Sequence, residues 1–319
     1  MNKRKLYIGA ATIGELEVIE EISNDEVFLK SLNKPKIDTY SITFDYLIQC
    51  GVDKVVTEDF ENFISSEENP QIFNFLKNKT SKISSNKIDE SREAIERIFK
   101  YYLPEGYNSN EKYDSIWYIQ NLLESLVIAA NTNTSVFKNM RSVTSNLEKA
   151  KDVLPLELYK PIHFLINSIK QDTVDLPFIG QSLEKRNLDR FNEIFESKTF
   201  EEYKLSHSIL DTQNEKKNSA ISNIQRNSVD LYRKNKDFLN IRKGIITTLS
   251  ITPKIIDASL GKIPGSIADL AVKFLTSLIE IQKRVIIYDQ EPLYDDLFRN
   301  RILIPLKKQL QEEELRKNK

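Results

Sequence analysis

Glycine is the residue whose scarcity most constrains the fold of this chain. Only 8 of the 319 residues are glycine, whereas glycine makes up about 7% of an average soluble protein. Tight turns, phosphate-binding loops and folds with many short strands all draw on glycine, because it adopts left-handed backbone conformations without a steric penalty. The shortage therefore predicts a mainly α protein with few tight turns.

The most regular pattern in the sequence is a pair of apolar segments within residues 244–288. They cover residues 245–260 and 267–288, and the turn between them contains Pro264 and Gly265. Apolar residues recur in the second segment at the spacing of an amphipathic helix. We therefore expect a helical hairpin, whose second helix carries on its apolar face Ile267, Leu270, Phe274 and Leu278.

Three surroundings would bury this apolar face: the core of the chain itself, a partner protein or a membrane. For a core position, the strongly apolar helix predicted over residues 113–130 is the expected neighbour. Insertion into a membrane is opposed by Lys273 and Glu280, because charged side chains are costly in hydrocarbon. Core and partner interface remain open as positions for the hairpin.

The first 66 residues have the element order of a small α/β unit. A strand is predicted over residues 5–10, a helix over 41–49 that stops at Gly51, and a second strand over 52–56. Strands that alternate with helices are typical of a parallel sheet. The predicted architecture is a multi-helix assembly, mainly α, with a small N-terminal α/β portion over residues 1–66.

The remainder of the chain is predicted to be helical after a polar connection. Residues 67–90 are rich in Asn, Ser and Lys, which predicts a linker or exposed loop. The helical domain then covers residues 91–319. Within it we expect one long polar helix over 200–243, a strand over 284–288 and a frayed terminus from Gln311.

The charge of the whole chain gives no preference for nucleic acid. Lys and Arg number 46 against 47 Asp and Glu, which leaves a formal net charge of -1, so no overall field attracts an anionic partner. Residues 211–243 are locally basic, a pattern of solvated helix faces that also suits nucleic acid or an acidic partner. The candidate contacts in this segment are Lys216, Lys217, Arg226, Arg233, Lys234 and Lys236.

A single cysteine, Cys50, excludes an intramolecular disulfide and a multi-cysteine metal site. The uncharged runs of the sequence are well short of the ~18 residues that a membrane-spanning helix needs. We therefore expect a cytoplasmic protein. Its abundance of Lys, Asn and Ile suggests an AT-rich, bacterial genome.

The common catalytic and nucleotide-binding motifs are missing from the sequence. It has no Gly-x-x-x-x-Gly-Lys-Ser/Thr, Gly-x-Gly-x-x-Gly or His-Glu-x-x-His pattern, and His163 and His207 lie on different predicted helices. Gly9 and Gly14 follow the first predicted strand, where a phosphate loop would lie, so nucleotide binding there is an alternative. The usual lysine and the second close glycine are missing from this loop, and we expect no cofactor or metal site.

Carboxylates provide an enzymatic alternative. A magnesium-dependent nuclease needs several carboxylate oxygens that converge on the metal from neighbouring strand ends. The candidates beside predicted strands are Asp53, Glu58, Asp289 and Glu291. Because such positions arise by chance among 47 acidic residues, the sequence favours a different function, a non-enzymatic interaction or scaffold subunit that presents amphipathic helices to a protein partner. The nuclease and a membrane-acting effector that uses the 244–288 hairpin are the alternatives.

Overall fold

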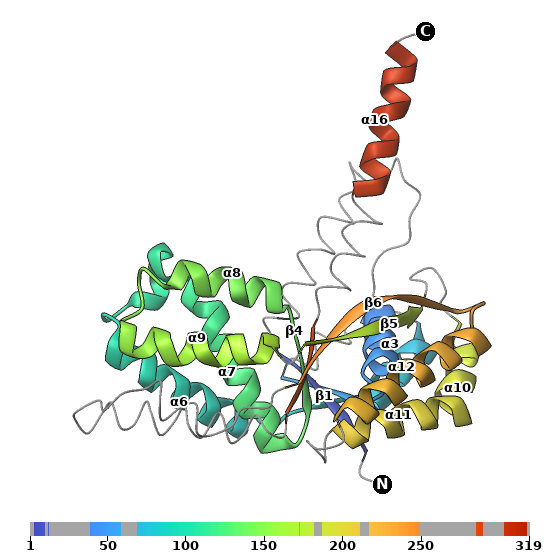
Figure 1. The fold of residues 1–319 in the computed structure, drawn as a ribbon, viewed down its shortest axis with the longest axis horizontal. Coiled ribbons are helices and arrows are strands. Elements are labelled where there is room, and N and C mark those ends of the chain that lie inside the picture. The colour runs from blue at the N-terminus through green and yellow to red at the C-terminus, as the bar shows by residue number, and fades with distance from the viewer. Residues whose placement is uncertain are drawn as a thin grey trace.

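The computed structural model of the protein contains one sheet, helices on both of its faces and a separate C-terminal helix (Figure 1). The residues that the structure describes are 3–9, 12, 39–58, 69–171, 173–181, 187–210, 217–248, 285–289 and 303–317.

The sheet has seven strands in the order β3-β2-β1-β4-β7-β6-β5. These strands are β1 (Lys5–Ile8), β2 (Lys54–Thr57), β3 (Thr80–Lys82), β4 (Ser135–Lys138), β5 (Thr173–Gln181), β6 (Leu239–Thr248) and β7 (Ile286–Asp289). Neighbours from β3 to β7 pair in parallel, whereas β6 is antiparallel to both β7 and β5. The carboxyl ends of the five parallel strands therefore meet at one edge of the sheet, the carboxyl edge, and their amino ends meet at the opposite, amino edge.

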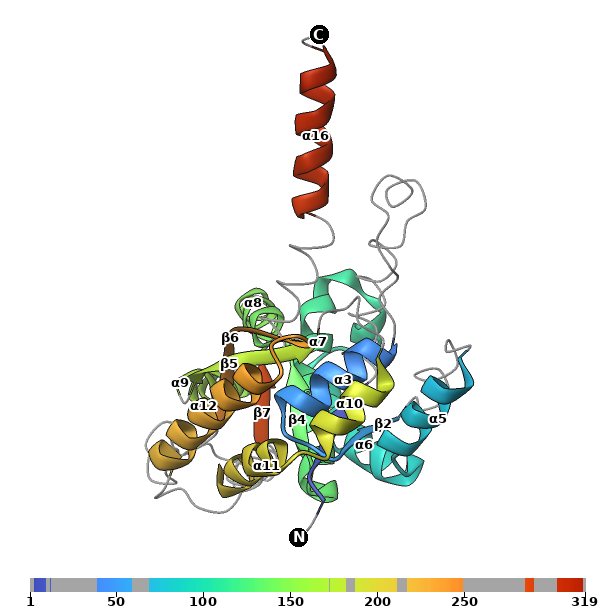
Figure 2. The ribbon, with the colours of Figure 1, turned by 90° about the vertical axis from the view of Figure 1, so that its right-hand side faces the viewer.

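Helices cover both faces of this sheet (Figures 1 and 2). One face carries α3 (Thr39–Gln49), α5 (Pro70–Lys79), α10 (Leu188–Phe195), α11 (Lys198–Leu210) and α12 (Lys217–Lys234). The other face carries α6 (Ser85–Tyr102), α7 (Asp114–Thr132), α8 (Met140–Ala150) and α9 (Leu156–Gln171). Two short 3-10 turns, η1 (Tyr107–Ser109) and η2 (Glu111–Tyr113), join α6 to α7. The last helix, α16 (Ile304–Lys317), extends away from both layers.

The central strands supply side chains to both helical layers, because successive side chains of a strand point to opposite faces. On β1, Leu6 and Ile8 belong to the core under α3, whereas Tyr7 packs with Ile128 of α7. On β4, Phe137 belongs to the core under α3 and its neighbour Val136 to the core under α7. Parallel strands that are buried on both faces form continuous apolar runs, which explains why these strands show no polar alternation.

The predicted fold class is confirmed: the chain is mainly α, and its N-terminal part contains a parallel α/β unit. The helix predicted over 41–49 is α3, and it ends at Gly51, whose φ of +54° is the left-handed conformation that favours glycine. The strand predicted over 284–288 is β7. Strands β4, β5, β6 and β7, from later in the chain, belong to the same sheet. The division into domains at residues 66 and 90 stays a prediction.

The segment 67–90, predicted as a polar linker or loop, instead contains α5, β3 and the start of α6. The side chain of Asn69 accepts hydrogen bonds from the backbone amides of Gln71 and Ile72, and Pro70 occupies the first turn. Asparagine before a helix and proline in its first turn are both favourable. Helix α5 was not predicted because its composition is polar. It packs on the sheet through three buried apolar residues, Ile72, Phe75 and Leu76.

The long helix predicted over 200–243 is also wrong, because the chain forms α11 and α12 and then enters β6 at Leu239. The residues from Leu239 onward pair with β5 over nine consecutive positions, from Gln181 opposite Leu239 to Thr173 opposite Thr247. Residues 245–248 of the first apolar segment thus belong to β6, residues 286–288 of the second belong to β7, and residues 249–284, with the predicted turn of the hairpin, lie outside the described residues.

At the C-terminus, α16 continues to Lys317, so the prediction of fraying from Gln311 is wrong. Pro305 lies in the first turn of this helix, where a missing backbone N–H costs no helical hydrogen bond.

Candidate functional site

The strand order of the sheet reverses at β1. The chain passes from β1 to β2 and then to β3 on one side, and it returns to the other side of β1 to form β4. In open α/β sheets such a reversal separates the connections that leave the two adjoining strands, and ligands bind there, outside the carboxyl ends. The carboxyl ends of β1 and β4 therefore form the candidate functional site.

The turn after β1 crosses directly to β4. The backbone N–H of Thr12 donates to the carbonyl oxygen of Gly9 at 3.0 Å, and the Thr12 hydroxyl donates to the carbonyl oxygen of Phe137 at 3.3 Å. A Cβ atom on Gly9 would lie 3.1 Å from the Tyr7 hydroxyl oxygen. Gly9 is itself buried, and any larger residue at this position would crowd Tyr7, so close packing favours glycine there.

Charged side chains from four elements gather on the α7 side of the carboxyl edge, and we call them, together with Tyr7, the carboxyl-edge cluster. Its members are Tyr7, Glu58, Arg92, Glu124 and Lys138. Glu58 follows β2, Lys138 ends β4, and Arg92 and Glu124 come from α6 and α7. The cluster thus depends on the parallel packing of the strands and on both helices above them.

Arg92 is the centre of the carboxyl-edge cluster. Its guanidinium lies 2.5 Å from a carboxylate oxygen of Glu58 and 3.5 Å from one of Glu124. The Tyr7 hydroxyl donates to the second Glu58 oxygen at 3.4 Å. The side chain of Arg92 is 41% exposed, whereas those of Glu58 and Glu124 are 12% and 15% exposed. The two carboxylates are therefore held by a cation that still reaches solvent.

Burial changes the proton affinity of this cluster. Burial raises the pKa of Glu124, and the nearby charge of Arg92 opposes that shift. Burial also raises the pKa of Tyr7, and the Glu58 carboxylate adds to the effect. Tyr7 is therefore a neutral hydrogen-bond donor at physiological pH, and Glu124 takes up a proton more readily than an exposed glutamate.

A second pair of charged residues continues the edge toward β7. Lys138 of β4 lies in register with Asp289 of β7, and both side chains are more than nine-tenths buried. A carboxylate oxygen of Asp289 accepts a hydrogen bond from the backbone N–H of Met140, 3.2 Å away at the start of α8. A carboxylate is favourable beside the positive end of a helix dipole, so Asp289 fixes α8 to the sheet.

The sheet brings only some of the predicted carboxylates together. Glu58 and Asp289 lie at the carboxyl edge, but Asp53 precedes β2 and lies at the amino edge. There Asp53 accepts from the backbone N–H of Arg4 at 2.9 Å and from the Lys204 ammonium at 3.0 Å. Glu291 lies outside the described residues. In the described part of the chain, no group of three or more His, Cys, Asp or Glu side chains is arranged to hold a metal ion.

Some of the predicted partner-contact residues lie outside the described residues, and the others lie on α12 or just after it. Ile267, Leu270, Phe274 and Leu278 of the apolar face, together with Lys216 of the basic segment, lie outside the described residues. Of the other basic candidates, Lys217, Arg226, Arg233 and Lys234 belong to α12 and Lys236 follows it. Arg226, Arg233, Lys234 and Lys236 are exposed, as a solvated helix face requires.

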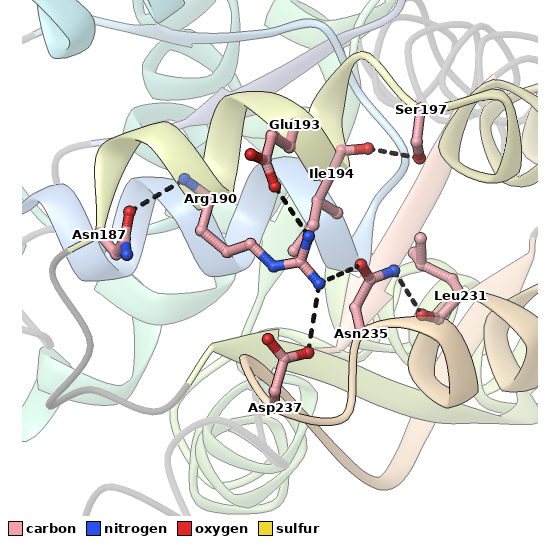
Figure 3. A network of polar contacts seen from close by, with 8 residues as sticks. All are labelled: Asn187, Arg190, Glu193, Ile194, Ser197, Leu231, Asn235 and Asp237. Atoms are coloured by element: carbon pink, nitrogen blue, oxygen red, sulfur yellow. Dashed lines mark hydrogen bonds and ion pairs between the residues drawn. The ribbon is translucent and has the colours of Figure 1, made fainter.

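A second polar network joins α10 to the turn between α12 and β6 (Figure 3). The Arg190 guanidinium contacts Glu193 at 2.8 Å and both Asn235 and Asp237 at 3.2 Å. The Asn235 side chain also donates to the carbonyl oxygen of Leu231 at 2.8 Å. These contacts terminate α12 and direct the chain into β6, which is a structural role.

A third network is buried at the amino edge, on the α3 side. The Arg4 guanidinium donates to the carbonyl oxygens of Cys50 at 2.7 Å and Gly51 at 2.9 Å. The Tyr288 hydroxyl donates to the Cys50 carbonyl oxygen at 3.1 Å and lies 2.8 Å from Nδ1 of His207. Burial raises the pKa of the Cys50 thiol, so this thiol is a poor nucleophile.

Of the residues in the carboxyl-edge cluster, the sequence indicated only Glu58. Arg92 and Glu124 lie on amphipathic helices and Tyr7 lies in an apolar strand, so no local pattern marks them as site residues. The strand that ends at Lys138 could have been predicted from the sequence. Asn133 adopts a left-handed conformation at the end of α7, and the short run Ser135–Lys138 follows it. A helix stop followed by such a run is typical of a buried strand.

The described residues thus define a sheet whose strand order reverses at β1, covered by helices on both faces, with a charged cluster at its carboxyl edge. Comparison of the chain with known protein families, with curated proteins and with solved structures finds no significant match. None of the helices in the described ranges is long and apolar enough to cross a membrane.

Proposed function

We propose that the protein binds a nucleotide, or a related molecule that contains a nucleoside, at the carboxyl edge between β1 and β4. The observation that carries this proposal is the reversal of strand order at β1, because ligands of open α/β sheets bind beside such a reversal. The residues at the ends of β1 and β2 favour a nucleotide over other ligands.

Each strand end offers a group that suits one part of a nucleotide. Gly9 is buried after β1 and carries no side chain that would stand between the strand end and a phosphate. Glu58 places a carboxylate at the end of β2, in contact with Tyr7 and Arg92, and an acidic residue at this position suits the paired hydroxyls of a ribose. Arg92 and Lys138 supply positive charge, and a guanidinium forms strong hydrogen bonds with phosphate.

The test is a binding measurement on the purified full-length chain. ATP, ADP, NAD and adenosine are titrated by calorimetry, and the unfolding temperature is recorded with each of them. We expect at least one nucleotide to bind and raise the unfolding temperature, because a ligand that binds only the folded state stabilises it. Glu58→Gln should weaken that binding tenfold or more.

The matched control is Glu93→Gln on α6. Glu93 is 66% exposed and pairs with Arg97 one turn along the same helix, so its loss should leave binding unchanged. A second variant, Gly9→Val, places a branched side chain against Tyr7 and should also weaken binding. The proposal fails if none of the four probes binds below about 1 mM, or if both Glu58→Gln and Gly9→Val bind as tightly as the wild type.

The interaction or scaffold role predicted from the sequence is a second proposal. One described feature favours it: α16 extends from the body of the molecule (Figures 1 and 2), and its large apolar side chains are exposed. The metal-dependent nuclease gains no such support, because Asp53 lies at the amino edge while Glu58 and Asp289 lie at the carboxyl edge. The cytoplasmic location and bacterial source stay predictions.

A further inference from the structure

The helix α16 presents an apolar surface that the layers of the sheet do not cover. Exposure is 51% for Ile304, 52% for Leu310 and 65% for Leu315, and Leu303 immediately before the helix is 47% exposed. Leu303, Leu306 and Leu310 follow one another at spacings of three and four residues, the spacing that places apolar residues along one seam of a helix pair. Exposed apolar stripes of this kind mark interaction surfaces.

The charges of α16 indicate what covers this surface. Lys307 and Lys308 lie on one side of Leu310, and three consecutive glutamates, Glu312, Glu313 and Glu314, lie on the other. Two copies that pair antiparallel around Leu310 bring the basic turn of each helix against the acidic turn of the other. A parallel pair would oppose lysine with lysine and glutamate with glutamate, which is unfavourable.

We propose that α16 pairs antiparallel with α16 of a second copy of this chain, and this proposal does not depend on nucleotide binding. The arrangement is two-fold symmetric, so the same surface of each copy meets itself. Leu310 then contacts Leu310 of the second copy, and Leu306 lies one turn away on the same seam. Because 14 residues make a helix of only about 21 Å, the interface is small and belongs to the weak, reversible class.

Sedimentation of the full-length chain across a range of concentrations tests the proposal. We expect a monomer–dimer equilibrium in the micromolar range that weakens severalfold at high salt, because salt screens exposed charges. Leu310→Asp should abolish the dimer. Leu156→Asp is the matched control, since Leu156 is 57% exposed on α9, and it should leave the dimer intact. A chain that stays monomeric at every concentration, or a dimer that survives Leu310→Asp, overturns the proposal.

The charge pairing is tested by reversal and mixing. A variant with Lys307→Glu and Lys308→Glu should be monomeric alone, and so should a variant with Glu312→Lys and Glu313→Lys. Mixing the two should restore dimers, because each basic turn again meets an acidic one. A mixture that stays monomeric would overturn the antiparallel pairing even if the wild-type chain forms dimers.

Discussion

At the scale of single residues, His207 is a buried group whose ionisation is suppressed by burial. Its ring is fully buried on α11, 2.8 Å from the Tyr288 hydroxyl and edge-on to Tyr203. Burial lowers the pKa of His207 well below its ordinary value, and the nearby Arg4 charge lowers it further. In the unfolded chain the imidazole takes a proton near pH 6.5, but in the folded protein it stays neutral. Protonation therefore stabilises the unfolded state relative to the folded state as the pH falls.

The contribution of His207 to stability should be complete above about pH 6.5 and should be lost as the pH falls below that value. We expect the free energy of unfolding to fall by about 1.4 kcal/mol per pH unit from this group alone. Urea unfolding between pH 5 and 7.5 measures the slope, and His207→Phe should flatten it. Equal slopes in wild type and His207→Phe would contradict the assignment.

At the scale of elements, the end of α3 depends on a side chain from before β1. The last carbonyls of a helix have no partner within it, and just after α3 one nitrogen of Arg4 donates to the carbonyl oxygens of both Cys50 and Gly51. The other terminal nitrogen of Arg4 lies 3.3 Å from the Tyr288 hydroxyl. Arg4 thus ties a helix end to β1 and β7 through a fork that a single ammonium cannot reproduce.

Arg4→Lys should therefore destabilise the protein by about 1–3 kcal/mol, because charge-assisted hydrogen bonds to buried carbonyls are lost. Chemical denaturation of the variant and the wild type measures the difference. The reverse exchange at the exposed neighbouring position, Lys5→Arg, is the control and should change stability by less than about 0.5 kcal/mol. If the two exchanges have the same effect, the fork does not support α3.

The elements that the sequence predicted are those with strong local signals. The stop at Gly51 and the run before Asp289 were visible, because a left-handed glycine and a β-branched run are local properties. Strand β5 was missed because Pro177 interrupts its pattern, yet β5 is the terminal strand of the sheet, where a missing backbone donor is tolerated. Strand β6 was missed because it follows a helix without a glycine or proline.

The candidate site was less predictable than the fold, for a physical reason. Gly9, Glu58 and Asp289 follow or end strands, so their place at one edge follows from the parallel sheet. Arg92 and Glu124 reach the edge only because α6 and α7 pack side by side over β1. Such packing depends on residues far apart in the chain, and no local pattern reveals it.

At the scale of the whole molecule, β1 and β4 are well-protected inner strands. Each is paired on both sides and covered by helices on both faces. We expect the backbone amides of these two strands to exchange slowly with deuterium, because they open only when the sheet as a whole opens. Strand β3, at one end of the sheet, should exchange faster. Mass-spectrometric exchange measures this order, and slower exchange in β3 than in β1 would contradict it.

The position of β7 has a consequence for how the protein is made. Among the described strands, residues 286–289 are made last, yet they lie between β4 and β6. Until then the strands already made can form only two partial sheets, each with an unpaired inner edge, and such edges are the usual starting points for aggregation. The seven-stranded sheet can therefore close only after the residues of β7 have been synthesised.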